Sequence, residues 1–429
     1  MKNSTVILLA GGKSTRFWPL PHKMTLPLMG KTFLDHQIEM VLTQGFTDII
    51  VVVTEKIAKQ TYSDQVKIVV QKGEGQAAAL ISAKEFITDK PTLVINADDI
   101  ISPDIFKTIA ARADDQVNLI VGTELDEYFP GGYLVLDGQK VIKVWEKPGA
   151  GFEPSKFMKL VCDYFISGTA LIKVLEQHKS FNPDSWYEDA LTDLIRAGQT
   201  FELIQYDGVW IPVKYPWHQL ELMDYFLNKI KASSIDESAT VDKTATLIGP
   251  VVLEKGVRVM EYAKLVGPVY IGAGTIVGNH TLVRQSMVGE NCVIGFSSDV
   301  TRSYMADNCW FHSNYLGDSV IASDVGMGAG AILANLRLDE GEIHSHIKGQ
   351  RTGSRRHKLG AIVGSGVRIG VGVYIMPGVK VGQNSSVGAG VLLQSDLPDN
   401  KRCYIKQTLT IEENTVSLSK DREKFRKRI

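Results

Sequence analysis

The sequence predicts two domains: a three-layer, Rossmann-like α/β domain over residues 1–228 and a left-handed parallel β-helix over residues 229–412, followed by a charged tail over residues 413–429. Three observations predict this fold class. Short apolar runs alternate with helical segments in the first half, and an aliphatic residue recurs at every sixth position in the second half. A chain of 429 residues is also too long for one ordinary core.

The first half is expected to form strands separated by helices. The strand candidates are short, β-branched runs: Val6–Leu9, Asp48–Val53, Val66–Val70, Thr92–Asn96, Leu119–Gly122 and Phe201–Tyr206. Helical segments lie between them: Thr32–Gln44, Gln76–Phe86 and Tyr187–Ala197. This alternation predicts a mostly parallel sheet that binds its ligands at the carboxyl ends of the strands.

The second half has a period of six residues, which fits neither a helix nor an alternating strand. The aliphatic positions are Ile235, Val241, Leu247, Leu253, Val259, Leu265, Ile271, Val277 and Val283, then Val288, Ile294 and Val300 after a shift of one residue, and later Val363, Ile369, Ile375, Val381 and Val387. In a hexapeptide β-helix each of these side chains points into a triangular interior. The stacked coils present long flat faces, through which such domains pair or trimerise.

Composition excludes several classes of protein. The formal net charge of −1 argues against a general binder of nucleic acid or anionic membranes. No apolar run approaches the length of a membrane span, and Val6–Ala10 is too short for a signal-peptide core. The four cysteines show neither a disulfide framework nor zinc-ligand spacing. We therefore expect a cytoplasmic protein with small-molecule partners.

The opening stretch carries the strongest functional signal. The apolar run Val6–Ala10 leads directly into Gly11 and Gly12, and Arg16 and Lys23 follow. Glycines after a buried strand let the backbone approach a ligand, and their amide groups can bind phosphates. Arginine and lysine supply the positive charge that a polyphosphate needs during phosphoryl or nucleotidyl transfer.

The stretch Val6–Lys23 resembles the signature of the sugar-1-phosphate nucleotidylyltransferases. Ser14 replaces a glycine of that signature and His22 replaces a proline, but both charged groups remain. The resemblance implies a nucleotidyltransferase domain in which Arg16 and Lys23 are catalytic.

A predicted metal ligand follows the apolar strand Pro91–Ile95, in the segment Asn96-Ala-Asp98-Asp99. A carboxylate at the carboxyl end of a strand can hold Mg²⁺, which prefers oxygen ligands and bridges phosphates. In the resembling family Asp98 corresponds to the metal ligand. Asp99 is the better candidate for a turn or helix cap.

The segment Gln71–Gln76 is similar to the base-binding segment of the same family. Its small residues let a helix begin close to a flat ligand, and the Gln71 amide can read the edge of a base. The predicted nucleotide-binding residues are therefore Gly11, Gly12, Gln71 and Gln76. The base stays open, with uracil or thymine favoured.

The sugar-binding elements of the family resemble Gly131-Gly132-Tyr133 and Val144-Trp-Glu146-Lys147-Pro148. The resemblance implies that Gly132 and Glu146 bind the sugar and that Lys147 binds its phosphate. The asparagine of the family's Asn-x-Gly-x-Tyr segment is absent, because this segment reads Val161–Phe165.

The second metal ligand of the family is also absent. It belongs to a Trp-x-Asp-x-Gly segment that reads Trp210–Lys214 here, with proline in place of the aspartate. Three alternatives remain. Asp98 acts with water molecules as the other ligands, a new donor such as Asp207 or His218 replaces the aspartate, or Lys214 supplies positive charge directly.

In the β-helix the segment Phe311–Asp318 departs from the six-residue period and resembles the His-x-x-Tyr-x-Gly-Asp motif of glucosamine-1-phosphate acetyltransferases. The resemblance implies that His312 removes a proton from the sugar amine, which then attacks acetyl-CoA. Tyr315 and Asn335 are the implied acceptor-site residues, and a homotrimer with acetyl-CoA between neighbouring coils is the implied assembly. Only Arg302 could replace the phosphate-binding lysine of that family.

Three further segments carry weaker expectations. The basic stretch Gly349–Lys358 could bind phosphates of CoA or of a sugar, or be a solvated loop. His344 and His346 have metal-like spacing but lie in a polar segment, where solvated side chains are expected. The tail is expected to be a surface helix or disordered.

The resemblance covers nearly the whole chain and implies a bifunctional enzyme similar to those that make UDP-N-acetylglucosamine. The α/β domain would transfer a nucleoside monophosphate from an NTP, with UTP favoured, to N-acetylglucosamine-1-phosphate, with Mg²⁺ as cofactor and pyrophosphate as leaving group. The β-helix would acetylate glucosamine-1-phosphate. Two alternatives remain: a monofunctional glucose- or mannose-1-phosphate nucleotidylyltransferase with a structural β-helix, and a non-catalytic regulatory subunit that binds nucleotide-sugar.

Overall fold

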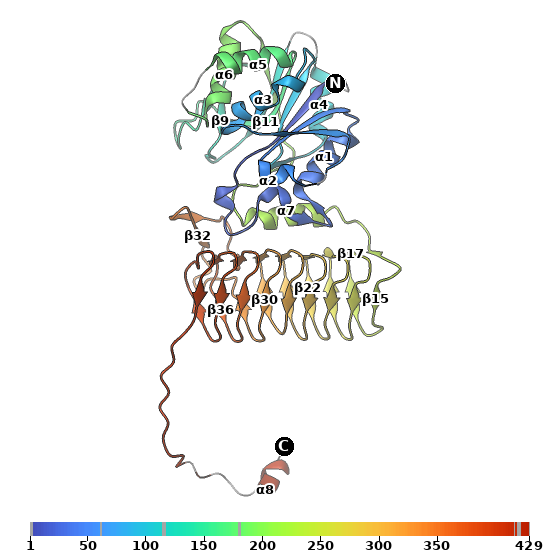
Figure 1. The fold of residues 1–429 in the computed structure, drawn as a ribbon, viewed down its shortest axis with the longest axis vertical. Coiled ribbons are helices and arrows are strands. Elements are labelled where there is room, and N and C mark those ends of the chain that lie inside the picture. The colour runs from blue at the N-terminus through green and yellow to red at the C-terminus, as the bar shows by residue number, and fades with distance from the viewer. Residues whose placement is uncertain are drawn as a thin grey trace.

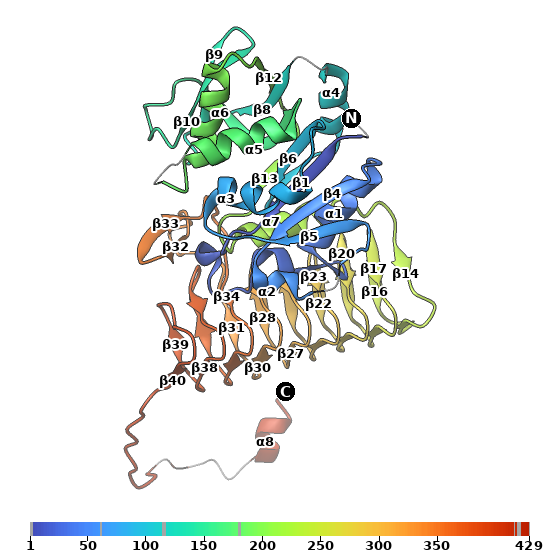
Figure 2. The same ribbon diagram turned by 45° about the horizontal axis from the view of Figure 1, so that its top comes forward.

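The computed structural model of the chain describes residues 3–60, 62–113, 117–178, 182–415, 417 and 422–428. An α/β domain lies along one side of a long β-helix (Figures 1 and 2). Within the described residues, no helix is both long enough and apolar enough to cross a membrane.

The α/β domain is built on one nine-stranded sheet. Its strand order is β5 (Val66–Val70), β4 (Asp48–Val53), β1 (Thr5–Ala10), β6 (Thr92–Asn96), β11 (Phe157–Phe165), β8 (Asn118–Glu124), β12 (Phe201–Gln205), β10 (Lys140–Glu146) and β9 (Gly132–Asp137). The first four strands are parallel, but β11 is antiparallel to both of its neighbours and β10 is antiparallel to β9 and β12. The expectation of a mostly parallel sheet is therefore wrong for the half of the sheet that contains β9, β10 and β11. These three strands follow one another in sequence without a crossover helix, so they cannot all run parallel.

Helices cover both faces of this sheet, which makes the three predicted layers. The helices are α1 (Phe33–Thr43), α2 (Glu55–Ala58), α3 (Gly75–Ser82), α4 (Asp104–Arg112), α5 (Gly168–Gln177), α6 (Trp186–Arg196) and α7 (His218–Leu227), with 3-10 turns η1 (Thr15–Phe17), η2 (Lys23–Thr25) and η3 (Lys84–Phe86). Side chains of α1, α4 and α7 pack on one face, and those of α3, α5 and α6 pack on the other. Alternate residues of β1 enter the two cores, as expected of a strand buried on both sides.

Two short ribbons matter for the site. The antiparallel pair β7 (Asp99–Ile101) and β13 (Trp210–Pro212) brings two segments distant in sequence together. The pair β2 (Pro27–Leu28) and β3 (Lys31–Thr32) leads into α1, whose first turn is closed by a reciprocal capping box between Thr32 and Asp35.

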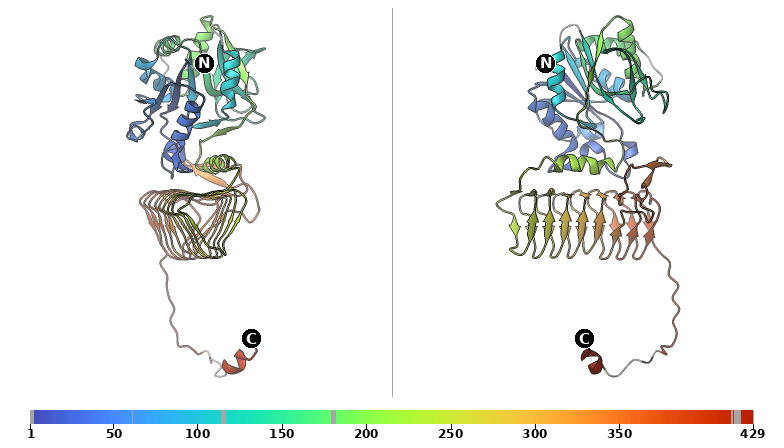
Figure 3. Two further views of the ribbon diagram at one scale, coloured as in Figure 1. Left: turned by 90° about the vertical axis from the view of Figure 1, so that its right-hand side faces the viewer. Right: turned by 180° about the vertical axis from the view of Figure 1, so that it is seen from behind.

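The β-helix has three parallel sheets. The first contains β14 (Ser234–Ile235), β17 (Val251–Leu253), β20 (Val269–Ile271), β23 (Met287–Val288), β26 (Tyr304–Met305), β29 (Val320–Ile321), β34 (Ile362–Val363) and β37 (Lys380–Val381). The second contains β15 (Thr240–Val241), β18 (Arg258–Val259), β21 (Ile276–Val277), β24 (Val293–Ile294), β27 (Trp310–Phe311), β30 (Gly326–Met327), β35 (Arg368–Ile369), β38 (Ser386–Val387) and β40 (Arg402–Cys403). The third contains β16 (Thr246–Ile248), β19 (Lys264–Val266), β22 (Leu282–Arg284), β25 (Asp299–Thr301), β28 (Tyr315–Gly317), β31 (Ile332–Leu333), β36 (Tyr374–Ile375) and β39 (Leu392–Leu393). The coils stack in register along the whole domain (Figure 3).

The aliphatic positions of the six-residue repeat form the interior of these coils, from Leu253 to Val387. The coil does not break at the segment Phe311–Asp318, where the sequence predicts an interruption. Met305, Phe311 and Leu316 continue the interior in register with their neighbours above and below. These residues are six and five positions apart, and Met305 and Phe311 are not aliphatic. The six-residue aliphatic pattern is therefore not apparent in this part of the sequence.

An antiparallel hairpin, β32 (His344–Ile347) and β33 (Gln350–Gly353), is inserted between β31 and β34 and projects toward the α/β domain (Figure 1). Residues 404–415 extend away from the last coil, and a short helix, α8 (Arg422–Arg426), lies in the described part of the tail (Figure 1).

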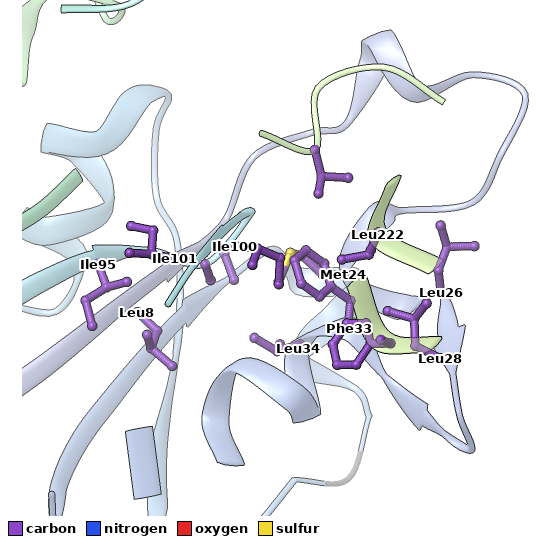
Figure 4. Close-up of a cluster of buried hydrophobic side chains, with 14 of the residues drawn as sticks. Leu8, Met24, Leu26, Leu28, Phe33, Leu34, Ile95, Ile100, Ile101 and Leu222 are labelled. Carbon is purple, nitrogen blue, oxygen red and sulfur yellow. The ribbon is translucent and has the colours of Figure 1, made fainter. Parts of the chain in front are cut away.

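The first sheet of the β-helix supports the α/β domain. Its outward side chains Tyr270, Met287 and Tyr304 belong to the same buried cluster as Met24 and Leu222. Figure 4 shows the upper part of this cluster, where residues of η2, β2, α1 and α7 meet those of the large sheet. The Tyr304 hydroxyl donates a hydrogen bond to the Pro27 carbonyl across the interface, at 2.7 Å.

Candidate active sites

One cavity of about 380 Å³ lies at the carboxyl ends of β1, β5 and β6. Its walls contain each residue for which the sequence predicts a role in the α/β domain: Gly11, Gly12, Arg16, Lys23, Gln71, Gln76, Asp98, Gly132, Glu146 and Lys147. These residues come from segments spread over more than half of the domain's length, and a parallel sheet gathers such strand ends at one edge.

The glycine-rich loop is shaped by close contacts. A side chain at Gly11 would overlap the Gln71 amide oxygen, whereas Gly12 faces open space. Ser14 takes the left-handed backbone conformation, with φ of 51°, that the missing glycine would adopt freely. The His22 ring nitrogen Nε2 lies 2.5 Å from the Gly12 carbonyl oxygen and so ties the two ends of the loop together. Burial lowers the pKa of His22.

Lys23 and Asp98, two of the predicted site residues, contact each other. The Lys23 ammonium forms an ion pair with Asp98 Oδ2 and donates to the Val213 carbonyl at 2.9 Å. Lys23 is buried, whereas Arg16 is exposed at the rim of the same cavity. Arg16 thus remains available to an anionic ligand, while Lys23 holds the carboxylate in place.

The structure distinguishes the candidates for the missing second metal ligand. Pairing of β13 with β7 places Lys214 in the cavity wall beside the Asp98–Asp99 segment. His218 Nδ1 instead contacts the Pro212 carbonyl and accepts from the Lys214 amide at 3.2 Å, and neither His218 nor Asp207 lines the cavity. Of the three candidates, the lysine is the one that reaches the site.

Lys214 is a half-buried cation. Its ammonium donates to the Pro130 carbonyl at 2.7 Å and lies 3.7 Å from the centre of the Phe129 ring. Burial lowers its pKa to about 8, against the attraction of Asp99, and nearby Arg16 lowers it further. Burial and the adjacent Asp98 raise the pKa of Asp99 to about 7.

The end of the cavity that contains Glu146 and Lys147 also contains an acidic partner that the sequence did not indicate. The Lys147 ammonium lies 2.8 Å from Asp184 and 3.2 Å from Glu146. Asp184 lies in a polar turn before α6, where no pattern sets it apart from an ordinary helix-start residue. Nearby, Gly132 leaves room for the Glu146 carboxylate, because a Cβ there would lie 3.2 Å from Glu146 Oε2.

Lys159 and Glu188, which line the same cavity, belong with Asp163 to a buried charged cluster that the sequence did not indicate. The Lys159 ammonium lies 2.8 Å from Asp163 and 3.8 Å from Glu188, and the Tyr187 hydroxyl donates to Asp163 at 2.8 Å. Burial raises the pKa of Glu188 to about 8, against the attraction of Lys159. Two charged residues four apart in an apolar strand share one face, and that spacing was the available signal.

In the β-helix the predicted acceptor residues form one network. Tyr315 donates to Asn335 Oδ1 at 3.3 Å, and Asn335 donates to Asp318 at 2.5 Å. Arg302 grips Asp318 through two hydrogen bonds of 2.7 and 2.8 Å. The Arg302 guanidinium therefore binds the Asp318 carboxylate in a bidentate pair.

His312 lies three residues before Tyr315, on an exposed corner of the same coil. Its backbone amide donates to Asn314 Oδ1 at 2.9 Å, which fixes the corner. Asn314 in turn donates to the Gly328 carbonyl of the next coil at 2.8 Å. The histidine ring is thus presented to solvent from a rigid support.

The basic insertion contacts the α/β domain. Arg355 pairs with Glu127 at 3.0 Å and Arg356 lies 3.9 Å from Glu221, so part of this stretch joins the domains. His344 Nδ1 lies 3.2 Å from the Glu342 carbonyl oxygen. Across the described ranges, no group of three or more His, Cys, Asp or Glu side chains could hold a metal ion.

A nucleotide-type cavity on an α/β sheet and a hexapeptide coil define a two-domain transferase. Residues 5–212 match the nucleotidyl transferase family model and residues 360–394 match the bacterial transferase hexapeptide model.

Full-length relatives are also known. The bifunctional sugar-1-phosphate nucleotidylyltransferase/acetyltransferase of Sulfurisphaera tokodaii is 32% identical over 407 residues, which cover 91% of this chain and 97% of that protein. The bifunctional proteins GlmU of Methanococcus vannielii and Methanocaldococcus jannaschii are each 31% identical, over 95% and 94% of this chain and 99% and 98% of their own lengths. The chain belongs to the family of bifunctional sugar-1-phosphate nucleotidylyltransferase/acetyltransferases.

Proposed function

We propose that the α/β domain transfers a nucleoside monophosphate from UTP to N-acetylglucosamine-1-phosphate and releases pyrophosphate. One observation carries this proposal: a single cavity contains the glycine-rich loop, the cationic side chains and the Glu146–Lys147 pair. The attacking sugar phosphate is already an anion, so no general base is needed. Catalysis then consists of positioning and charge neutralisation.

Different residues of the cavity bind different parts of the two substrates. Gly11, Gly12 and Arg16 bind the triphosphate, from which pyrophosphate leaves, and Gln71 with Gln76 bind the base. Lys147 holds the phosphate of the attacking sugar, and Glu146 accepts hydrogen bonds from its hydroxyl groups. In-line attack places the sugar-phosphate oxygen opposite the pyrophosphate that leaves, and the two binding ends of the cavity suit that arrangement.

Asp98 fits a metal ion only in part. Lys23 already occupies Asp98 Oδ2, and Asn96 donates to Asp99 at 3.3 Å, so one carboxylate oxygen of Asp98 is left as a ligand. This donor set suits Mg²⁺ held mainly by the substrate phosphates and water. Bound there, Mg²⁺ would neutralise phosphate charge. We assign the rest of that neutralisation to Arg16 and Lys214, since Lys214 occupies the segment that gives the second carboxylate in the resembling family.

The β-helix is proposed to acetylate glucosamine-1-phosphate with acetyl-CoA. His312 accepts a proton from the sugar amine, and the amine nitrogen attacks the thioester carbonyl, which releases CoA. Tyr315 and Asn335 position the acceptor, with Asp318 and Arg302 fixing Asn335. A homotrimer is proposed because Trp310, Tyr374 and Leu392 are large apolar side chains exposed on the two sheets that do not carry the α/β domain. The substrates are metabolites of the cytoplasm, which is where we place the protein.

One observation favours a second candidate function, a non-catalytic subunit that binds nucleotide-sugar. A lysine stands where the resembling family has an aspartate ligand. A panel of NTPs against sugar-1-phosphates, with pyrophosphate release as the readout, separates the two candidates. Acetyl-CoA consumption with glucosamine-1-phosphate is measured in parallel. Turnover with UTP and N-acetylglucosamine-1-phosphate supports the proposal, and nucleotide-sugar binding without turnover in either assay supports the subunit.

A His312→Ala variant tests the assignment of the two reactions to two domains. We expect a loss of acetyl transfer by about 10³-fold with nucleotidyl transfer unchanged, because a positioned base contributes roughly 10²–10⁴-fold. His346→Ala is the matched control, as it removes an exposed histidine of the hairpin. Equal acetyl transfer in both variants would remove His312 from the mechanism.

A further inference from the structure

A buried lysine interrupts the apolar face on which the α/β domain rests. The outward positions of the first β-helix sheet are apolar from coil to coil: Val252, Tyr270, Met287, Tyr304, Val320 and Ile362. The next residue in register is Lys380, whose side chain is 2% exposed. A buried ammonium needs partners, so its surroundings indicate what it holds.

The partners of Lys380 come from three separate segments. Its ammonium donates to the His346 carbonyl of the hairpin and lies 3.1 Å from Asp396 of a later coil. It also lies 4.9 Å from the centre of the Trp18 ring, within the range of a cation–π contact. Trp18 belongs to the glycine-rich phosphate loop of the other domain.

The same loop makes two further contacts with the last coils. Trp18 Nε1 donates to Asp399 Oδ1 at 2.8 Å, and Gln383 Nε2 donates to the Pro19 carbonyl at 3.1 Å. The Pro19 carbonyl sits against Gly364, where a Cβ would lie 2.9 Å from its oxygen. Asp399 is itself fixed, since it accepts from the Gln383 amide at 2.7 Å.

These contacts bear on the cavity because Trp18 and Pro19 lie between Arg16 and Lys23, which both belong to its wall. Arg16 precedes Trp18 by two residues, and Lys23 follows Pro19 within the same loop. Phe17 is buried, so this segment is held from the core on one side and from the β-helix on the other. Arg16 itself is exposed, and its direction depends on the backbone that these contacts hold.

We propose that Lys380, Gln383 and Asp399 of the β-helix are positioning residues for nucleotidyl transfer, because they hold the Trp18–Pro19 segment so that Arg16 faces the triphosphate. The inference rests on the proposed function of the cavity. It makes the last coils of the second domain a structural part of the first domain's site. Preorganisation of this kind lowers the cost of ordering a cationic side chain when the substrate binds.

The test is a set of full-length variants assayed for both reactions. Trp18→Phe removes the indole N–H and keeps a ring, Asp399→Ala removes the acceptor, and Lys380→Met removes the charge at similar length. Each is expected to lower kcat/KM for UTP about tenfold, the usual scale for one buried hydrogen bond. The KM for the sugar phosphate and the rate of acetyl transfer are expected to stay within twofold.

Two comparisons separate positioning from a general loss of structure. Asp399→Asn keeps an oxygen acceptor and should restore most of the activity lost in Asp399→Ala. The Trp18→Phe and Asp399→Ala effects should not add in the double variant, because both remove the same hydrogen bond. Tyr304→Phe is the matched control: it removes a different interdomain hydrogen bond, to Pro27, and should leave kcat/KM for UTP unchanged.

Several results would overturn the inference. They are unchanged UTP kinetics in Trp18→Phe and Asp399→Ala, equal losses in both reactions, or the same loss in Tyr304→Phe. If the wild-type protein releases no pyrophosphate, the proposed function fails instead. The positioning role is then decided by the Kd of Mg²⁺–UTP, which should rise about tenfold in Trp18→Phe and Asp399→Ala but not in Tyr304→Phe.

Discussion

At the scale of single residues, the site differs from the resembling family in the sign of one charge. Lys214 occupies the segment that would carry a carboxylate ligand, and it faces Asp99 and Arg16 across the cavity. A fixed ammonium can neutralise a phosphate without a metal ligand, but only while it is protonated. Because the pKa of Lys214 is lowered, its loss of charge should affect the pH dependence of nucleotidyl transfer.

Substitution of Lys214 tests this role. We expect Lys214→Ala to lower kcat/KM for UTP by roughly 10²-fold, as for the loss of one preorganised donor. Lys214→Arg keeps the charge and should retain most activity. Initial rates of pyrophosphate release measure both, and an unchanged Lys214→Ala variant would assign the neutralisation elsewhere.

The pH dependence supplies an independent check. The Lys214 pKa is lowered to about 8, so the side chain is charged below that pH and neutral above it. In the wild type, kcat/KM for UTP should fall as the pH rises through about 8. In Lys214→Arg this fall should vanish, because arginine stays protonated. A fall of the same size in both proteins would exclude Lys214 as its cause.

At the scale of elements, close packing between neighbouring strands, coils and helices determines where the proposed functional side chains can lie. In β28, Gly317 leaves room for Tyr315 and Asn335, which come from adjacent coils. In β11 and α6, facing positions hold ionisable groups away from water. Each arrangement gives a prediction.

Gly317→Ala should disrupt the acceptor network. The added Cβ would lie 2.6 Å from the Tyr315 hydroxyl and closer still to the Asn335 amide nitrogen, so both side chains must move. We expect acetyl transfer to fall at least tenfold with nucleotidyl transfer unchanged. Gly326→Ala is the control, since its Cβ would meet only the flexible Arg368 side chain. Equal acetyl transfer in the two variants would contradict the proposed acceptor site.

Glu188 should make the stability of the α/β domain depend on pH. Its folded-state pKa is raised from 4.5 to about 8, so the folded protein binds a proton that the unfolded chain releases between these values. Stability from this group is therefore full below about pH 4.5 and declines as the pH rises through 8. Glu188→Gln should unfold at a higher urea concentration than the wild type at pH 8.5, with less difference at pH 5. Parallel curves at all pH values would show that Glu188 is ionised in the fold.

At the scale of the whole molecule, one buried hydrophobic cluster contains residues of both domains. Residues of β20, β23 and β26 are buried against η2, β2 and α7. The glycine-rich loop and the basic insertion add polar contacts at one end of this interface. The β-helix thus supports the first domain along most of its length, which differs from two domains joined by a flexible linker.

Met287→Asp tests this coupling. A carboxylate placed in the apolar interface lacks a partner and should cost roughly 3 kcal/mol or more. We expect a lower Tm and a separation of the calorimetric transition into two. Leu338→Asp is the control, because Leu338 is fully exposed. A single transition at the wild-type Tm in Met287→Asp would show that the interface contributes little.

Much of the fold was predictable from local patterns. The strands β4, β5 and β6 have the predicted bounds, because β-branched runs between turn residues specify a buried strand directly. The repeat predicted the β-helix for a similar reason, since each coil contacts mainly its neighbours. The coils that contain Met305 and Phe311 were not predicted from the repeat, because these interior side chains are not aliphatic. The domain limits at residues 228 and 412 stay predictions.

The sequence by itself determined the α/β layers, the hexapeptide coils, and the residue types that meet in the cavity. Only the tertiary structure decided that Lys23 pairs with Asp98, that Lys214 rather than His218 faces the cavity, and that the phosphate loop rests on the last coils of the β-helix. The physical reason is the range of the interactions. Strand and coil patterns are written in neighbouring residues, whereas these contacts join segments up to 381 positions apart, and no local pattern records them.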